Sequence, residues 1–266
     1  KLGVNDFGLG AVGSNNLGQE FKATRLEYYV TRITVVHDGG IETEISDDVV
    51  ALVRPEDEIS TTIQLGSLDV ETITSVKFHI GVYEPINNGD PTLFDVVHPL
   101  SPKSPSMHWG WAAGYRFIAY EGTGGEEFSQ NFQLHGLGND NYFEVESPVD
   151  VETVDDDLVM NVNGDYAAGL DNIDLTAGII SHGDYGPAKT VLENWRDLVF
   201  GLYYVGIDDI NNDVNLKIFP NPTNKDIMVK FEGIDNVDHI DLYNPLGELI
   251  QQNVVTGNNQ LAISIL

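Results

Sequence analysis

The chain has 266 residues, and its 42 Asp and Glu against 13 Lys and Arg give a formal net charge of −29 at pH 7. The phosphates of nucleic acids and anionic lipid head groups repel such a polyanion, so neither is expected as a partner. Cysteine is absent, which excludes disulfides, thiolate metal ligands and cysteine nucleophiles. Hydrophobic residues make up 41% of the chain, enough for a folded core, and no apolar run is long enough to span a bilayer.

Short stretches of alternating apolar and polar residues run through the first two hundred residues, separated by turns rich in glycine, asparagine and aspartate. This alternation predicts half-buried strands. It covers residues 25–36, 59–65, 73–82, 115–120, 128–134 and 158–162. Regularly spaced short strands of this kind predict an all-β fold, an antiparallel β-sandwich.

One segment, Ala188 to Leu202, has its apolar residues at helical spacing instead. The dipeptide Gly186-Pro187 before it suits the start of a helix. We therefore expect one amphipathic helix that closes the first domain, with Trp195 as a buried anchor.

A polar stretch at residues 207–214 reads as a linker, and short strands are expected again at 216–219, 227–231, 239–243 and 248–251. The predicted organisation is a β-sandwich domain at 1–206 and a small immunoglobulin-like β-module at 215–266. From Asn212 onward there are 3 Lys and 7 Asp or Glu, a net charge of −4, which leaves −25 on the rest of the chain. The acidity therefore belongs to the larger domain.

The segment His98 to Gly122 stands out because it combines two histidines, one methionine and two tryptophans with several prolines. In a chain without cysteine, histidines must supply the strong ligands of a metal site. Imidazole suits copper, zinc, iron or nickel, and a thioether such as Met107 favours copper. The alternative is that His98, His108, Trp109 and Trp111 form an aromatic plug under a long loop.

Three further histidines are candidate metal ligands. His135 lies at a predicted strand end beside glycine, and a hairpin of strands 115–120 and 128–134 would return it near His108. His37 and His182 each lie at a strand end beside glycine and aspartate, where they either complete a metal site or serve as turn residues.

The strand at 25–36 and the block MHWGWAAGYRFIAYEG, followed by FQLHGLG, resemble the MbnP-like copper-binding family. The matching residues are Met107, His108, Trp109, Trp111, Gly114, Tyr115, Phe117, Glu121, Gly122 and His135. The resemblance spans roughly residues 1–202. It implies a copper site built from histidines and a tryptophan oxidised to kynurenine. Trp109 or Trp111 matches the neighbourhood of the oxidised position, and His135 matches the histidine strand.

The segment KIFPNPT, followed by LYNPLGELI, resembles the C-terminal sorting domain of the type IX secretion system. The resemblance implies that the protein interacts with the type IX machinery and is secreted or attached to the outer-membrane surface. The sequence ends before the last strands of such domains, so the module is expected to be incomplete.

These features together predict a secreted or surface-exposed copper-binding protein for copper acquisition or delivery, not an enzyme. No Gly-x-Ser-x-Gly elbow or His-Glu-x-x-His motif is present. The alternative is an adhesion or carbohydrate-binding module with a structural His-Trp loop. Bound Ca²⁺ is conceivable at the oxygen-rich segments 139–141 and 209–213, although neither has EF-hand spacing.

Overall fold

The structure is a computed structural model. It describes residues 1–155, 157–200, 215–219, 226–232, 239–243, 249–254 and 260–264. The chain divides into two compact units, Lys1–Tyr203 and Tyr204–Leu266. The predicted linker at 207–214 lies outside the described residues. Among the helices of the described ranges, none is long and apolar enough to cross a membrane.

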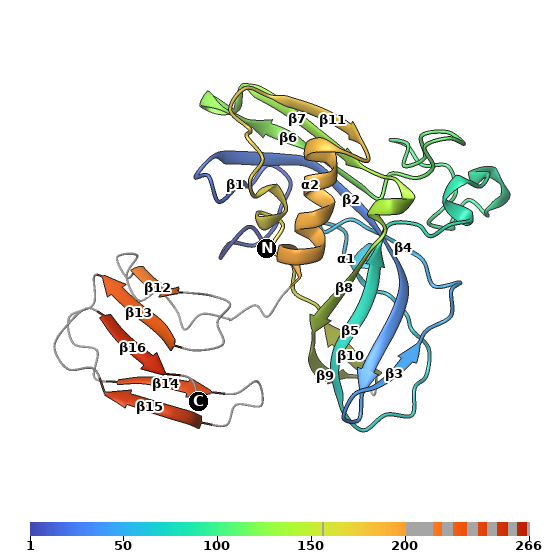
Figure 1. The fold of residues 1–266 in the computed structure, drawn as a ribbon. Coiled ribbons are helices and arrows are strands. Elements are labelled where there is room, and N and C mark those ends of the chain that lie inside the picture. Colours follow the sequence, from blue (N-terminus) through green and yellow to red (C-terminus); the bar gives the residue numbers. More distant parts are fainter. Residues whose placement is uncertain are drawn as a thin grey trace. The chain divides into compact units, whose positions relative to one another are not determined.

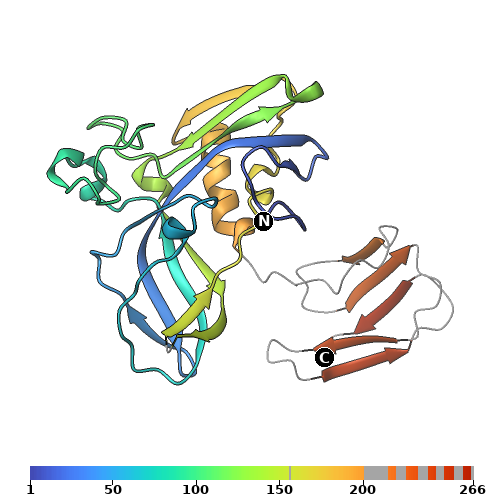
Figure 2. The same cartoon turned by 180° about the vertical axis from the view of Figure 1, so that it is seen from behind.

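The first unit is built on one curved sheet in which the strand order is β11-β7-β6-β2-β5-β8 (Figures 1 and 2). Strands β1, β3 and β4 also pair with β2. The strands are β1 (Val12–Ser14), β2 (Glu20–His37), β3 (Ile41–Glu44), β4 (Ala51–Val53), β5 (Ile73–Ile80), β6 (Ile118–Gly124), β7 (Gln130–Gly136), β8 (Phe143–Pro148) and β11 (Ile179–Gly183).

The long strand β2 joins the two halves of the sheet. Its first half pairs with β6 and its second half with β5, both antiparallel. The register shifts between Thr31 and Thr34, where Arg32 has a φ of +49°. Such a bulge increases the local twist of a strand, which explains the curl of the sheet. The mostly β architecture predicted from the alternating pattern is confirmed.

The last strand of the sheet departs from the predicted antiparallel arrangement, because β11 pairs with β7 in parallel. A parallel pair needs a long connection. Residues 137–178 supply it and contain β8 and the hairpin of β9 (Asp150–Val154) with β10 (Asp157–Asn161). This long-range pairing brings His182 to the neighbouring position of His135.

Helix α2 (Gly186–Asn194) covers the inner face of the β6–β7 part of the sheet (Figures 1 and 2). It is continued by one π-helical turn, Trp195–Val199. The predicted helix thus exists but begins two residues earlier and ends its α-helical part at Asn194; residues 201 and 202 lie outside the described ranges.

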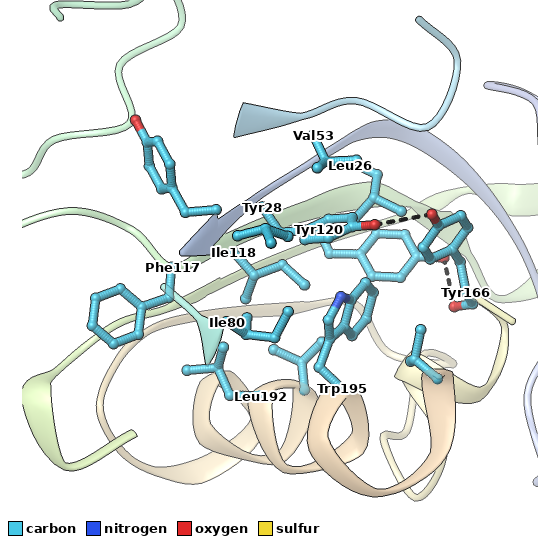
Figure 3. Packing of buried hydrophobic residues seen from close by; sticks show 14 of the residues in the cluster. Leu26, Tyr28, Val53, Ile80, Phe117, Ile118, Tyr120, Tyr166, Leu192 and Trp195 are labelled. Atoms are coloured by element: carbon cyan, nitrogen blue, oxygen red, sulfur yellow. Dashed lines mark hydrogen bonds between the residues drawn. The ribbon is translucent and has the colours of Figure 1, made fainter. Parts of the chain in front are cut away.

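Trp195 is fully buried, as predicted, and lies among the rings of Tyr28, Tyr120 and Tyr166 (Figure 3). The ring centroids are 5.8 to 5.9 Å from that of Trp195. The hydroxyls of Tyr28 and Tyr166 lie 3.1 Å apart, and the Tyr120 hydroxyl donates to the Tyr166 carbonyl. These tyrosine hydroxyls are therefore hydrogen-bonded, whereas Nε1 of Trp195 is buried with no hydrogen-bond partner within the described residues.

The predicted strand at 59–65 is wrong. Residues Glu58–Thr61 form a helical turn, α1, and no strand occurs between Thr62 and Thr72. The side chain of Asp57 accepts a hydrogen bond from the Ile59 amide, which caps this turn. Ile59 is exposed, whereas Ile63 and Leu65 are partly buried and pack against the core from an irregular segment that pairs with no strand.

The C-terminal unit contains two small antiparallel sheets. Strands β12 (Asn215–Phe219), β13 (Asp226–Glu232) and β16 (Gln260–Ser264) form one, and β14 (His239–Tyr243) with β15 (Leu249–Val254) forms the other. The four strands expected from the sequence are present. Strand β16 was not expected, and its Ile263 is buried, as is Val229 of β13.

Candidate metal centre

The register of β7 and β11 places His135 directly beside His182. Side chains alternate between the two faces of a strand, so both imidazoles leave the sheet on the same side. Leu134 points to the inner face with α2, and His135 therefore points to the outer face. The two rings stack with centroids 4.1 Å apart and planes only 9° from parallel. The hairpin of β6 and β7, predicted from the sequence, is confirmed. The imidazole that stacks on His135 is nevertheless that of His182, which comes from β11, and not that of His108.

A tight turn before β6 sets an indole against the histidine pair. The Trp109 amide donates to the Gly114 carbonyl, and the Arg116 amide donates to the Met107 carbonyl, which closes the turn. The Trp109 ring lies edge-on to both imidazoles, 5.0 Å from His182 and 6.3 Å from His135 between centroids. Its other contact is the Arg116 guanidinium, 4.9 Å from the ring centroid.

The two tryptophans of this turn have different surroundings. Trp109 is 42% exposed and contacts the histidine pair, whereas Trp111 is 66% exposed. The Trp111 carbonyl accepts a hydrogen bond from the side chain of Asn88. Only Trp109, of these two, is placed to act together with the imidazoles.

The thioether of Met107 is held by a charged partner. Met107 is 1% exposed, and its Sδ lies 3.2 Å from Nη2 of Arg25. A guanidinium this close engages one lone pair of the sulfur and places a positive charge beside it, which disfavours a metal cation there. Met107 is therefore a packing and hydrogen-bonding residue in this arrangement.

A chain of ion pairs lies under the turn on the outer face of the sheet. Arg25 donates to Glu27 and to Glu121, and Arg54 donates to the other oxygen of Glu27. Glu121 also accepts from Nε2 of His135 at 2.8 Å. The alternating pattern assigned no contact to these charged residues. Arg25 and Glu27 lie in the strand predicted at 25–36, and Glu121 directly follows the strand predicted at 115–120.

Burial keeps both imidazoles neutral. It lowers the pKa of His135 to about 4, although the hydrogen bond to Glu121 acts in the opposite direction. Burial and the positive charge of Arg116 lower the pKa of His182. Burial alone would raise the pKa of Glu121, but the hydrogen bonds from His135 and Arg25 outweigh it and the pKa is lowered. Neutral imidazoles are the form that binds metals.

Two ring nitrogens in this cluster are suited to bind a metal. Nδ1 of His135 and Nε2 of His182 are both buried and have no hydrogen-bond partner within the described residues. A buried polar atom without a partner is costly, and a bound metal would satisfy it. No group of three His, Asp or Glu side chains among the described residues is arranged around one metal position. The residues thus fit a metal held by two histidines and a donor of another kind.

The other candidate histidines lie in separate environments. His37 uses both ring nitrogens, with Asp38 at 3.0 Å and Thr43 at 2.8 Å. The ring of His98 stacks on Phe94, and its Nδ1 accepts from the Leu100 amide.

His108 lies edge-on to Tyr115, and its Nδ1 accepts from the Gly110 amide. Within the described ranges, no ring contact joins His37, His98 or His108 to the His135–His182 pair. The structure therefore brings together two of the five candidate histidines.

The oxygen-rich segment 139–141 forms a 3₁₀ turn whose amide side chains are already engaged. Asn139 accepts from Asn87, and Asn141 donates to the carbonyls of Leu137 and Asp184. The second oxygen-rich segment, 209–213, lies outside the described residues.

Comparison with known proteins agrees with this architecture. The family model of MbnP matches residues 2–183, and that of the secretion system C-terminal sorting domain matches residues 217–266. Among solved structures, MbnP from Methylosinus trichosporium is similar, with 18% identity and a TM-score of 0.35. The match covers 53% of this chain and 65% of that protein. No curated protein matches. The sorting domain indicates a secreted or surface-attached protein, and the chain belongs to the MbnP family.

Proposed function

We propose that the chain is a secreted or surface-attached copper-binding protein that takes up or delivers copper and does not turn over a substrate. His135 and His182 are the proposed protein ligands. The observation that carries this proposal is their stacked pair, in which each ring has one buried nitrogen without a partner. We further propose that residues 1–206 form the copper-binding domain and 215–266 the sorting domain, with a linker at 207–214.

Copper suits the available donors better than the alternatives do. Zinc sites of structural type use four protein ligands, usually with thiolates, and the chain has no cysteine. Calcium and magnesium require oxygen ligands, but Glu121 and Glu27 are occupied by arginines. Two neutral imidazoles are nitrogen donors for which copper has a high affinity. Membership of the MbnP family supports the same choice.

The third donor is proposed to come from Trp109 after oxidation to kynurenine. Dioxygen adds across the C2–C3 bond of the indole and cleaves it, and both oxygen atoms remain in the N-formyl product. Water then releases formate and leaves a free aromatic amine. The amine provides a nitrogen lone pair that indole lacks. Trp109 is the proposed site because it contacts both imidazoles, whereas Trp111 does not.

The proposal is tested by copper titration of the full chain, purified with its own modifications. One copper ion per chain is expected to bind tightly, and His135→Ala and His182→Ala should each abolish this tight binding. Thermal unfolding of the copper-free variants checks that they are folded. Unchanged copper affinity in both folded variants would show that the ligands lie elsewhere.

A second candidate function is carbohydrate binding at the tip of the turn. The observation in its favour is the exposed ring of Trp111, because a sugar ring can stack on an accessible indole. If this reading is correct, Trp111→Ala abolishes retention of the protein on a glycan array and His182→Ala does not. If the copper-binding proposal is correct, His182→Ala abolishes copper binding in the titration and Trp111→Ala leaves it unchanged.

A further inference from the structure

We infer that Glu121 is a positioning residue that fixes the tautomer of His135 and so selects Nδ1 as the nitrogen presented to copper. This inference rests on the proposed copper site. It assigns a role to a carboxylate that lies one hydrogen bond away from the metal position and does not bind the metal itself.

One oxygen of the Glu121 carboxylate joins Arg25 to His135. Its Oε1 accepts two hydrogen bonds at 2.8 Å, one from Nη1 of Arg25 and one from Nε2 of His135. A carboxylate paired with an arginine is ionised and can only accept. The proton between Glu121 and His135 therefore belongs to Nε2 of the imidazole.

The position of Glu121 is itself fixed by the ion pairs behind it. Arg25 is held by Glu27 through Nε and Nη2, and Glu27 is buried and also accepts from Arg54. Both donors go to the same oxygen, Oε2 of Glu27, and Nη1 donates to Glu121, so the guanidinium has little freedom to rotate. The carboxylate of Glu121 is consequently held in place on the outer face of β6, diagonal to His135 of β7, which is paired with Ala119.

The tautomer of His135 follows from this arrangement. A neutral imidazole has one protonated nitrogen, so protonation of Nε2 leaves Nδ1 with a free lone pair. That atom is buried and has no hydrogen-bond partner within the described residues. A carboxylate on the far nitrogen of a metal-binding histidine orients the ring and strengthens its donor atom. The free lone pair thus lies in the imidazole that stacks on His182.

Two substitutions separate this role from a general structural one. Glu121→Met has a similar length but removes the acceptor oxygen, whereas Glu121→Gln retains an oxygen that can accept from both Arg25 and His135. Copper affinity is expected to fall about 10- to 100-fold in the Met variant and much less in the Gln variant. Glu42→Gln, which removes one carboxylate from an ion pair with Lys77 elsewhere, is the charge-matched control.

The tautomer is read directly in the copper-free full chain by long-range ¹⁵N NMR of the histidine rings, which distinguishes a protonated from an unprotonated ring nitrogen. The expected result is an unprotonated Nδ1 and a protonated Nε2 for His135 in the unaltered chain and in the Gln variant, and a mixture in the Met variant. The NMR measurement needs no copper. If the Met variant is poorly folded, the tautomer of His135 can still be determined in the unaltered chain and in the Gln variant.

The outcomes distinguish a failure of the role assigned to Glu121 from a failure of the proposed copper site. A protonated Nδ1 in the unaltered chain, or equal copper affinities of the folded Met and Gln variants, overturns the positioning role while leaving the copper site standing. Failure of the unaltered chain to bind copper overturns the proposed function, and with it the role of Glu121 in metal binding.

Discussion

His135 and His182 are separated by 46 intervening residues, yet they lie side by side on a parallel pair of strands with their rings 4.1 Å apart. Parallel strands cannot be joined by a short turn, so the pair depends on the whole segment between β7 and β11. The two rings are nearly parallel, and their lone pairs do not point at a common position. If both rings bind one metal ion, as proposed, at least one of them has to rotate.

Removal of one ring of the pair is expected to abolish tight copper binding. His182→Ala leaves a single imidazole, which is a weak site on its own, while His37→Gln leaves the pair intact because His37 is bonded to Asp38 and Thr43. Copper titration by competition with a chelator measures both. Equal loss of affinity in the two variants would indicate a site that includes His37.

The two tryptophans of the turn are expected to differ in modification. Intact-mass and peptide analysis of the mature chain should show that Trp109 has lost one carbon and gained one oxygen, as kynurenine formation requires. Trp111→Phe should leave this modification in place, whereas Trp109→Phe should remove it and the associated near-ultraviolet absorption. Modification of Trp111 alone would contradict the assignment.

Helix α2 packs so closely on β7 that a larger residue at Gly136, beside the candidate site, is expected to destabilise the fold. A Cβ on Gly136 would lie 2.6 Å from Cγ of Leu192 and 2.7 Å from the Ala188 carbonyl oxygen. Gly136→Ala is therefore expected to lower the free energy of unfolding by about 1–3 kcal/mol through overpacking. Denaturant unfolding measures the change.

The matched control is Gly8→Ala. A Cβ there meets nothing nearer than 4.0 Å, so an effect within about 0.5 kcal/mol is expected. If Gly136→Ala and Gly8→Ala unfold alike, the helix and strand are not packed as closely as described.

Asp38, in the turn that follows β2, is expected to make the free energy of unfolding depend on pH. Hydrogen bonds from His37 and the Thr72 amide lower the pKa of Asp38 to about 2, from an ordinary value of 3.8. A depressed carboxyl pKa means that the unfolded chain binds the proton more readily, so the stabilisation is present above pH 3.8 and is lost as the pH falls towards 2. The sign is thus loss of stability in acid.

Asp38→Asn tests this dependence. The difference in unfolding free energy between the unaltered chain and the variant should be largest above pH 4 and should shrink steadily at lower pH. Chemical denaturation over a pH series gives this difference directly. A difference that does not vary with pH would mean that Asp38 has an ordinary pKa in the folded protein.

The parts of the fold that depend on local patterns were predictable from the sequence. Alternation along residues 25–36 and 73–82 identified β2 and β5, and helical spacing identified α2 with Trp195 at its buried face. Alternation failed at 59–65 because a pattern of apolar residues does not reveal whether a strand lies beside it to pair with, and Ile63 and Leu65 pack against the core without one. The π-helical turn after Asn194 likewise depends on tertiary packing.

The candidate site was predictable only in its parts. Sequence identified His135, His182 and Trp109 as candidates but could not pair them, because the parallel register of β7 and β11 is a long-range property. The same holds for Glu121 and Arg25, which lie on different strands and meet only after β2 and β6 pair. Single charged residues at alternating positions carry no sign of such a contact.

Whether His135 and His182 together bind copper can be seen in a crystal structure of the copper-loaded full chain, with anomalous diffraction recorded on both sides of the copper absorption edge. We expect one strong anomalous peak within bonding distance of Nδ1 of His135 and Nε2 of His182, beside the side chain at position 109. A copper peak at His98, His108 or His37, with the His135–His182 pair still stacked and free of metal, would contradict it.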